Sequence, residues 1–300
     1  MLGRYETGSQ KVFKVFNYLI MTLVGLLTFY PFWYVFITSF NVGTDTQKGG
    51  VYLWFRTFTL ENYATAFRNS QIYNSFMISI GRTVLGVALG LFFTALLAYA
   101  LSVKSLPGRK GINMFFFITT VFSGGMIPYY ILLRDLKLTA SFWIYILPGI
   151  YNFMNMILMR TYFNSTIPDE LRESAEMDGA SELTTLMRIY VPLAKPIIAT
   201  LALFIGVGNW NDWFTGAYYV SNQKLYPAAT VLQQILNNAM SMVQIKQGQE
   251  NANLIALISQ PTPFSIQMAF VMILTMPIIV VYPFLQKYYV KGVMIGSIKG

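Results

Sequence analysis

Residues 16–40 form an apolar stretch without any charged side chain, and no other feature constrains the fold of this chain as strongly. About twenty consecutive apolar residues in a helix are enough to cross the hydrocarbon core of a bilayer. Because that core holds no water to satisfy backbone N–H and C=O groups, such a segment has to be helical. Its second half contains Tyr30, Pro31, Phe32 and Trp33 rather than a small-residue cleavage site, so we expect a retained helix and not a signal peptide.

The same pattern recurs along the chain. Hydrophobic residues make up 55% of the 300 positions and charged residues only 11%, whereas about a quarter of the residues in a soluble domain are charged. Further spans are predicted at about 74–103, 112–133, 142–159, 193–220 and 264–285. We therefore predict an all-α membrane protein with six transmembrane helices.

The third span is interrupted by Ser123, Gly124 and Gly125 and by Pro128. These residues predict a kink or a local unwinding of the helix. The two glycines fit a gating hinge and a site of close helix packing equally well.

The distribution of Lys and Arg predicts the orientation. Basic residues are more numerous on the side that holds both termini and the loops after the second and fourth spans, so this side is expected to be the cytoplasm. The chain then divides into a first helix with an extracytoplasmic segment (1–73), a core (74–290) and a cytoplasmic tail (291–300). The core carries a cytoplasmic loop at 160–196 and an extracytoplasmic loop at 221–262. We attribute the net charge of +9 to the basic loops and expect no nucleic-acid partner.

Missing residue types exclude several kinds of catalyst. The chain has no cysteine and no histidine, which excludes disulfides, thiolate catalysis, Ser-His triads and ordinary zinc sites. It also lacks a G-x-x-x-x-G-K-[ST] run, so it cannot bind a nucleotide through a P-loop of its own. We predict no catalytic residue, no metal site and no cofactor bound by this chain.

The loop at 160–196 concentrates half of the 12 Asp and Glu residues of the chain. These are Asp169, Glu170, Glu173, Glu176, Asp178 and Glu182. Apolar spans lie on both sides, so the loop is a charged structure set inside a membrane protein.

Two short helices are predicted within this loop. Thr166 is expected to cap the first, with Asp169 as the reciprocal partner of a capping box. Gly179 predicts a left-handed stop, and Ser181 is expected to cap a second helix that runs to about 191 and is ended by Pro192. Such a protruding helix–glycine–helix is suited to dock into a groove of another protein.

The motif ESAEMDGA at 173–180, followed by IYVP at 189–192, resembles the "EAA" loop of binding-protein-dependent ABC importer permeases. Ser174 replaces the first Ala of that pattern. Three further runs resemble the carbohydrate-uptake permeases: SGGMIPYYILL from 123, GNWNDWF from 208 and YPFLQKYYVKGVMIGSIKG from 282. The chain is most similar to the LplC/YtcP-like branch, which is related to the maltose permease subunit MalG.

This resemblance implies a type I importer of MetI-like architecture in a bacterial cell membrane. Its expected partners are a second permease subunit, two cytoplasmic ATPase subunits that use ATP and Mg, an extracytoplasmic sugar-binding protein, an oligosaccharide and the surrounding lipid. The residues carried over as contacts to the ATPase are Glu173, Ala175, Asp178, Gly179 and Ala180. The resemblance also implies that the tail reaches the ATPase and that residues 241–253 enter the binding protein and displace its sugar.

Candidate pathway residues lie on the fourth and fifth spans. They are Asn152, Asn155, Asn209, Trp210, Asp212 and Trp213. Helical spacing places Asn209 and Asp212 on one face with Gly216 and Tyr219. The two asparagines of the fourth span either face a cavity or form interhelical hydrogen bonds.

Asp212 is the one acidic residue inside a predicted span, where a carboxylate is costly. It fits a sugar-contacting wall, an ion pair with Arg82, or a place near the outer interface. A rival function is an ion-coupled secondary sugar transporter with Asp212 as the coupling carboxylate. The charged docking loop and the lack of an inverted repeat disfavour that rival.

Overall fold

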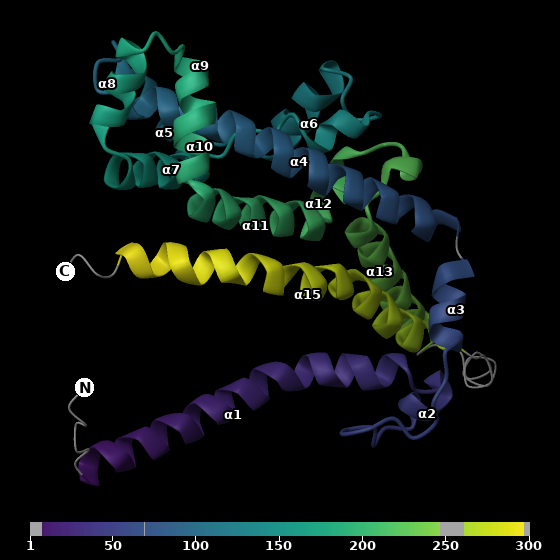
Figure 1. The fold of residues 1–300 in the computed structure, drawn as a ribbon. Coiled ribbons are helices and arrows are strands. Elements are labelled where there is room, and N and C mark those ends of the chain that lie inside the picture. Colours follow the sequence, from purple (N-terminus) through teal and green to yellow (C-terminus); the bar gives the residue numbers. More distant parts are fainter. Residues whose placement is uncertain (1–7, 69, 247–260, 297–300) are drawn as a thin grey trace. The chain divides into compact units, whose positions relative to one another are not determined.

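The computed structural model describes residues 8–68, 70–246 and 261–296. Within these residues the elements are helical, with one isolated β-bridge between Asn41 and Phe58 (Figure 1). In chain order they are α1 (Gly8–Ser39), α2 (Gly43–Gln47), α3 (Glu61–Arg68), α4 (Ser70–Ser102), α5 (Arg109–Val121), α6 (Met126–Asp135), the 3-10 helix η1 (Phe142–Tyr145), α7 (Phe153–Thr166), α8 (Asp169–Met177), α9 (Glu182–Thr185), the π-helix η2 (Leu186–Tyr190), α10 (Val191–Leu193), α11 (Lys195–Asn211), α12 (Phe214–Tyr219), the 3-10 helix η3 (Gln223–Leu225), α13 (Ala228–Lys246) and α15 (Pro263–Gly296). The predicted all-helical class is confirmed.

The chain forms two compact units. One contains Met1–Asn69 and Ile235–Ile273, and the other contains Ser70–Gln234 and Leu274–Gly300. Every candidate site residue named from the sequence belongs to the second unit.

Three helices in the described residues are long and apolar enough to cross a membrane: Gly8–Ser39, Gln71–Ser102 and Pro263–Pro283. Two bent pairs would raise the number to five. They are α5 with α6, bent by 112°, and the helix Glu182–Leu193 with α11, bent by 87°.

The fourth predicted span, 142–159, is not a continuous helix. Residues 142–145 form η1, turns follow, and α7 begins only at Phe153 and runs on to Thr166. Pro148 and Gly149 interrupt the stretch, because proline lacks the N–H that a helix needs and glycine weakens it. The prediction of a continuous helix at 142–159 was wrong because apolar composition alone does not distinguish such turns from a helix.

The predicted break in the third span is confirmed. Between α5 and α6 the backbone is extended at Phe122, and Gly125 has φ +87°. A side chain at Gly125 would meet nothing within 4 Å. The glycine therefore serves the backbone turn and not close helix packing.

Glycine does permit close packing between α4 and α11. A Cβ added to Gly86 would lie 2.2 Å from Nδ2 of Asn209, and one added to Gly206 would lie 3.4 Å from Val87. Small residues let membrane helices approach in this way. The other face of this region packs α4 against α7, where Ala98, Met156 and other fully buried side chains form the core.

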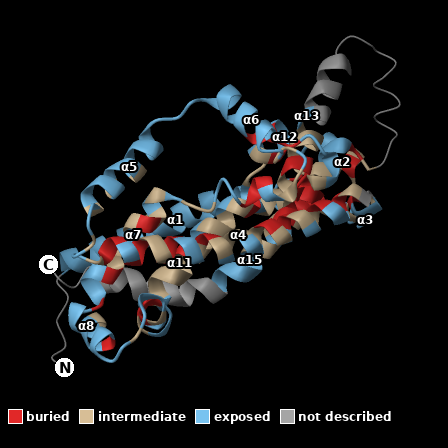
Figure 2. Cartoon of the chain, turned by 90° about the horizontal axis from the view of Figure 1, so that it is seen from above, coloured by how far each residue is buried: buried red, intermediate tan, exposed pale blue. Residues whose placement is uncertain are grey.

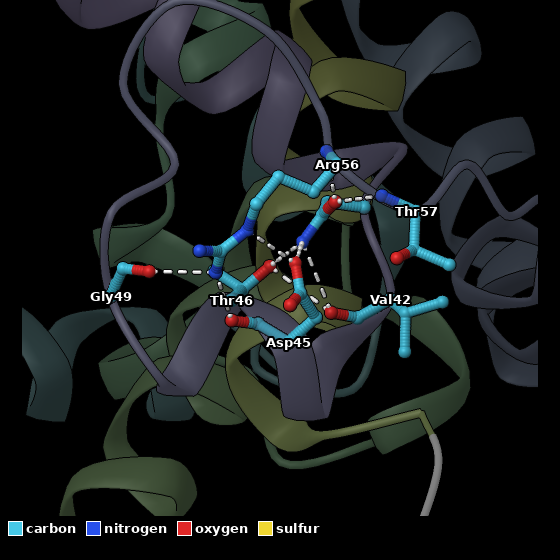
Figure 3. A network of polar contacts seen from close by, with 7 residues as sticks. Val42, Asp45, Thr46, Gly49, Arg56 and Thr57 are labelled. Carbon is cyan, nitrogen blue, oxygen red and sulfur yellow. Dashed lines mark hydrogen bonds and ion pairs between the residues drawn. The ribbon is translucent and has the colours of Figure 1, made fainter.

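In the first unit, the segment after α1 is held by a polar network around Asn41, whose side chain is fully buried (Figure 3). Its Nδ2 donates to Asp45 Oδ2 (3.0 Å) and Thr46 Oγ1 (2.8 Å), and its Oδ1 accepts from the backbone N–H groups of Arg56 and Thr57. The hydrogen bond from Asn41, together with Arg56, holds the pKa of Asp45 below its usual range. One amide thus organises the segment that follows α1.

Candidate functional site

The first helix of the charged loop, α8, begins without a side-chain cap. Its N-cap residue is Pro168, with φ −62° and ψ 142°, whereas Thr166 is the last residue of α7. The predicted capping box between Thr166 and Asp169 is therefore wrong, because proline already sets the entry angle and α7 uses the threonine. The Asp169 carboxylate instead accepts a hydrogen bond from Lys104, 2.6 Å away. This contact lowers the pKa of Asp169 and raises the pKa of Lys104.

The turn at the loop tip forms as predicted. Gly179 has φ +76°, its N–H bonds the carbonyl of Glu176, and the N–H of Ala180 bonds the carbonyl of Ala175. These are the two hydrogen bonds of a Schellman motif, which ends a helix through a left-handed residue. Ser181 then caps α9 by accepting from the N–H of Thr184.

The second helix is longer than predicted and does not end at Pro192. It continues through the π-helical turn η2 to Leu193 and then bends by 87° into α11. A proline inside an α-helix clashes with the carbonyl four residues earlier. The wide turn immediately before Pro192 changes that spacing, and π-helical turns of this kind recur at functional sites.

Charged side chains join the two loop helices. Arg172 of α8 lies 3.5 Å from a Glu176 carboxylate oxygen and 3.6 Å from one of Glu182 in α9. The Tyr99 hydroxyl, from the end of α4, donates a hydrogen bond to Glu182. The loop is therefore attached to the membrane helix α4 through Glu182, and to the turn that follows α4 through the Lys104–Asp169 contact.

Aromatic packing makes the base of the loop rigid. The ring of Tyr190 meets those of Tyr99 and Phe163 edge-on, with centroids 4.8 Å and 5.2 Å apart. Ala175 on the inner face of α8 is only 7% exposed. A push on the loop would consequently reach α4 and α7 through close-packed side chains, because packed interiors transmit displacement.

The outer surface of the loop is free in the described structure. Glu173, Asp178 and Gly179 are exposed, as the exposed colour over most of α8 shows (Figure 2). Met177 at the tip is 88% exposed, and Leu183 on α9 is exposed as well. Sequence reasoning missed Met177, although a methionine next to the helix-ending Asp-Gly pair was the available signal. An exposed flexible thioether surrounded by carboxylates is suited to bind another protein.

The second candidate site centres on Arg82 and Asp212. Arg82 of α4 is 2% exposed; its Nη2 lies 2.6 Å from Asp212 Oδ2 and its Nη1 donates to the Asp212 carbonyl. The guanidinium carbon also lies 4.4 Å from the ring centroid of Tyr145. Of the three readings of Asp212, the structure therefore contains the ion pair.

Asp212 also interrupts the fifth span. It is the C-cap of α11, with ψ 103°, and α12 begins at Phe214. The predicted single helical face running from Asn209 to Tyr219 is wrong, because the helix is broken between these residues. At this break the backbone N–H of Thr215 finds a partner nearby, because the Asp212 side chain accepts a hydrogen bond from it.

The neighbours of Asp212 have mixed surroundings. Trp210 is buried, and its Nε1 donates to the carbonyl of Leu274. Asn209 lies against Gly86 on α4. Trp213 is half-buried, and its ring meets that of Phe214 edge-on. The structure brings Asn209 and Trp210 into packing contacts, and leaves Asp212 and Trp213 half-exposed.

Of the two asparagines of the fourth span, Asn152 has a role that neither prediction gave it, and for Asn155 both readings stay predictions. Asn152 precedes α7 as its N-cap, and its Oδ1 accepts from the N–H of Asn155 at 3.0 Å. Its side chain therefore satisfies a helix end. The side chain of Asn155 is half-buried.

Two regions given roles by the resemblance are only partly described. The predicted loop at 221–262 contains the helix α13, which begins at Ala228 and runs to Lys246. The predicted displacement segment 241–253 extends beyond it into 247–260, outside the described residues. The tail is helical to Gly296, and 297–300 lie outside the described residues.

The chain is similar to known proteins along nearly its whole length. Residues 103–295 match a family model described as binding-protein-dependent transport system inner membrane component. Protein LplC of Bacillus subtilis (strain 168) is 38% identical over 99% of this chain and 98% of that protein. The polygalacturonan/rhamnogalacturonan transport system permease protein YtcP of the same organism is 34% identical over 97% of this chain and 100% of that protein. A crystal structure of a bacterial ABC transporter involved in the import of the acidic polysaccharide alginate has a chain with a TM-score of 0.84, 30% identity, and coverage of 95% of this chain and 99% of that one.

Proposed function

This chain belongs to the family of binding-protein-dependent transport system inner membrane components, and from this membership we propose how its two sites divide the work of an importer. It is a membrane permease subunit of an ABC importer for carbohydrates, since relatives aligned over nearly its full length are sugar permeases. No relative supports the ion-coupled alternative.

The loop at 160–196 is the joint to a partner ATPase that uses ATP and Mg. Glu173, Ala175, Asp178, Gly179 and Ala180 form or shape the docking surface. The observation that carries this proposal is an exposed helical tip on a rigid, aromatic base. Nucleotide-driven movement of the ATPase would displace α8, and the packed base would pass that displacement to α4 and α7. This is alternating access by rocking of packed elements.

The proposed topology has six spans with both termini in the cytoplasm. The chain pairs with a second permease to form the pathway, and an extracytoplasmic binding protein delivers the sugar. The 14-residue helix α7 is about 21 Å long, shorter than the hydrocarbon core of about 30 Å. We therefore assign the irregular residues 142–152 to the fourth crossing, where neighbouring helices shield the backbone.

The proposed substrate is an acidic oligosaccharide containing uronate units. A relative at 34% identity is named for polygalacturonan, and the solved transporter at 30% identity imports alginate. Among the pathway candidates, the half-exposed Asn155, Asp212 and Trp213 are the best placed to meet a ligand.

Uptake into sealed vesicles that contain the complete importer tests this function. Labelled oligogalacturonate presented on the binding protein should accumulate with ATP and not with an ion gradient alone. Uptake driven by the gradient without ATP would reject the ABC assignment. If ATP drives uptake of a neutral arabino-oligosaccharide and never of oligogalacturonate, the permease function stands and the acidic substrate is wrong.

A further inference from the structure

A pocket of about 840 Å³ lies within the second unit, away from the Arg82–Asp212 pair. Its walls come from the turn after α4, the first half of α5 and the side of α7. None of the residues that line the pocket belongs to the proposed docking surface or to the pathway candidates.

The pocket is strongly basic. Lys104, Arg109, Lys110 and Arg160 all line it, and no acidic residue is among its lining. Lys104 is paired with Asp169, whereas the described residues contain no ion pair for the other three. Such a concentration of cations creates a positive potential that attracts an anion.

Arg160 has one unsatisfied polar atom. Its Nη1 donates to Oδ1 of Asn113 at 2.6 Å, but its Nε is buried without a hydrogen-bond partner. A buried N–H of a charged group that lacks a partner is costly. Because Arg160 also lines the pocket, an anion placed there would lie beside a guanidinium that the protein leaves incompletely hydrogen-bonded.

The first turn of α5 adds to the anion-binding character. The helix begins at Arg109 after Gly108, which provides no capping side chain, and residues 108–111 line the pocket. The N–H of Arg109 donates to the Leu106 carbonyl, and the first turn, which has no side-chain cap, carries the positive end of the helix dipole. Helix N-termini of this kind bind phosphate.

The remaining walls are apolar and indicate what the anion is attached to. Leu106, Met114, Phe117, Phe153 and Ile157 line the pocket. The single neutral polar side chain, Asn113, is fully engaged, since its Nδ2 donates to the Arg109 carbonyl. Sugar hydroxyls would find few partners here, whereas an acyl chain would find apolar contacts.

We propose that this pocket binds an anionic phospholipid, with the phosphate at Arg109, Lys110, Arg160 and the start of α5, and an acyl chain along the apolar wall. The position fits, because the turn at 103–108 directly follows the membrane helix α4. Basic pockets between membrane helices recognise lipid headgroups in this way. The bound lipid would stabilise the packing of α5 against α7, the helix that leads into the coupling loop.

The test uses the complete importer in an uncharged detergent, titrated with short-chain phosphatidylglycerol and followed by native mass spectrometry. Phosphatidylcholine of the same chain length is the headgroup control. Phosphatidylglycerol should bind in preference, and R109Q/K110Q should weaken binding about five-fold for each cation removed. The matched control R134Q/K137Q removes two exposed cations outside the pocket and should bind like the parent.

A second variant keeps all four cations. N113D places a carboxylate beside Arg160 within the pocket and should compete with the lipid phosphate, lowering its affinity while the intact mass shows an assembled importer. Equal binding of the two lipids, or unchanged binding in both pocket variants, would overturn the proposal. Displacement of phosphatidylglycerol by oligogalacturonate would also overturn it, in favour of a sugar site.

Discussion

Among single residues, Gly179 has the clearest physical requirement. Its φ of +76° lies in the left-handed region, where a residue with a Cβ costs about 1–2 kcal/mol. Nothing lies within 4 Å of an added Cβ. A substitution there therefore acts through the backbone and not through a steric clash.

We expect Gly179→Val to misdirect α8 relative to α9. The folded permease should remain in the membrane, while the ATPase co-purifies poorly and uptake falls. Gly179→Asn is the matched control, because asparagine tolerates the left-handed region. Normal ATPase association in Gly179→Val would show that the joint lies elsewhere.

The pair Arg82 and Asp212 is the second residue-scale feature. We expect Asp212→Asn to lower the thermal midpoint of the purified importer, because it leaves the buried guanidinium of Arg82 without its carboxylate partner. The double variant Arg82→Met/Asp212→Asn should recover much of that loss, since no buried charge is left unpaired. A midpoint unchanged in Asp212→Asn, together with lost uptake, would instead indicate direct contact with the ligand.

At the scale of elements, irregular segments and helix starts are held by a few short polar side chains. Asn41 holds the chain after α1, as Asn152 holds the start of α7 and Ser181 the start of α9. In each case the oxygen of one short side chain accepts a hydrogen bond from backbone N–H groups that have no partner within a helix. These residues, more than the apolar ones, decide where the elements begin and end.

The substitution Asn41→Ala tests this for the 41–58 segment. It removes the acceptor of the N–H groups of Arg56 and Thr57, two part-buried hydrogen bonds worth about 0.5–1.5 kcal/mol each. Trypsin cleavage after Arg56 should become faster in the membrane-bound importer. Gln47→Ala, an exposed position on α2, is the control and should leave the cleavage rate unchanged. Equal rates in the two variants would mean that Asn41 does not hold the segment.

At the scale of the whole molecule, the two proposed partner contacts lie in different stretches of the chain. The coupling loop belongs to the second unit, and α13 leads from that unit into the segment 241–253. If the proposal holds, substitutions can therefore disable the ATPase contact and the binding-protein contact independently.

Replacing residues 243–251 by a Gly/Ser linker should disable the contact to the binding protein and leave the contact to the ATPase intact. Assembly and basal ATP hydrolysis should persist, because the coupling loop is untouched, while uptake falls because sugar stays on the binding protein. The amount of labelled oligosaccharide retained by the binding protein measures the effect. Uptake at the parental rate would assign this segment a passive role.

The sequence by itself determined the helical class, the long apolar spans and the turn at Gly179. Each follows from local rules: uninterrupted apolar residues require a helix in lipid, and a left-handed helix end requires glycine or asparagine. The break at Ser123 to Gly125 and the cap at Ser181 are local in the same sense, and the structure confirms both.

Only the tertiary structure decided which residues far apart in the chain meet. Arg82 joins Asp212 across 130 positions, and Arg160 lies beside Asn113 with its Nε unsatisfied. The fourth span was predicted wrongly because residues 146–152 are as apolar as a helix although they form turns and extended backbone. Periodicity reports on one helix at a time, whereas ion pairs and pockets depend on how several helices pack.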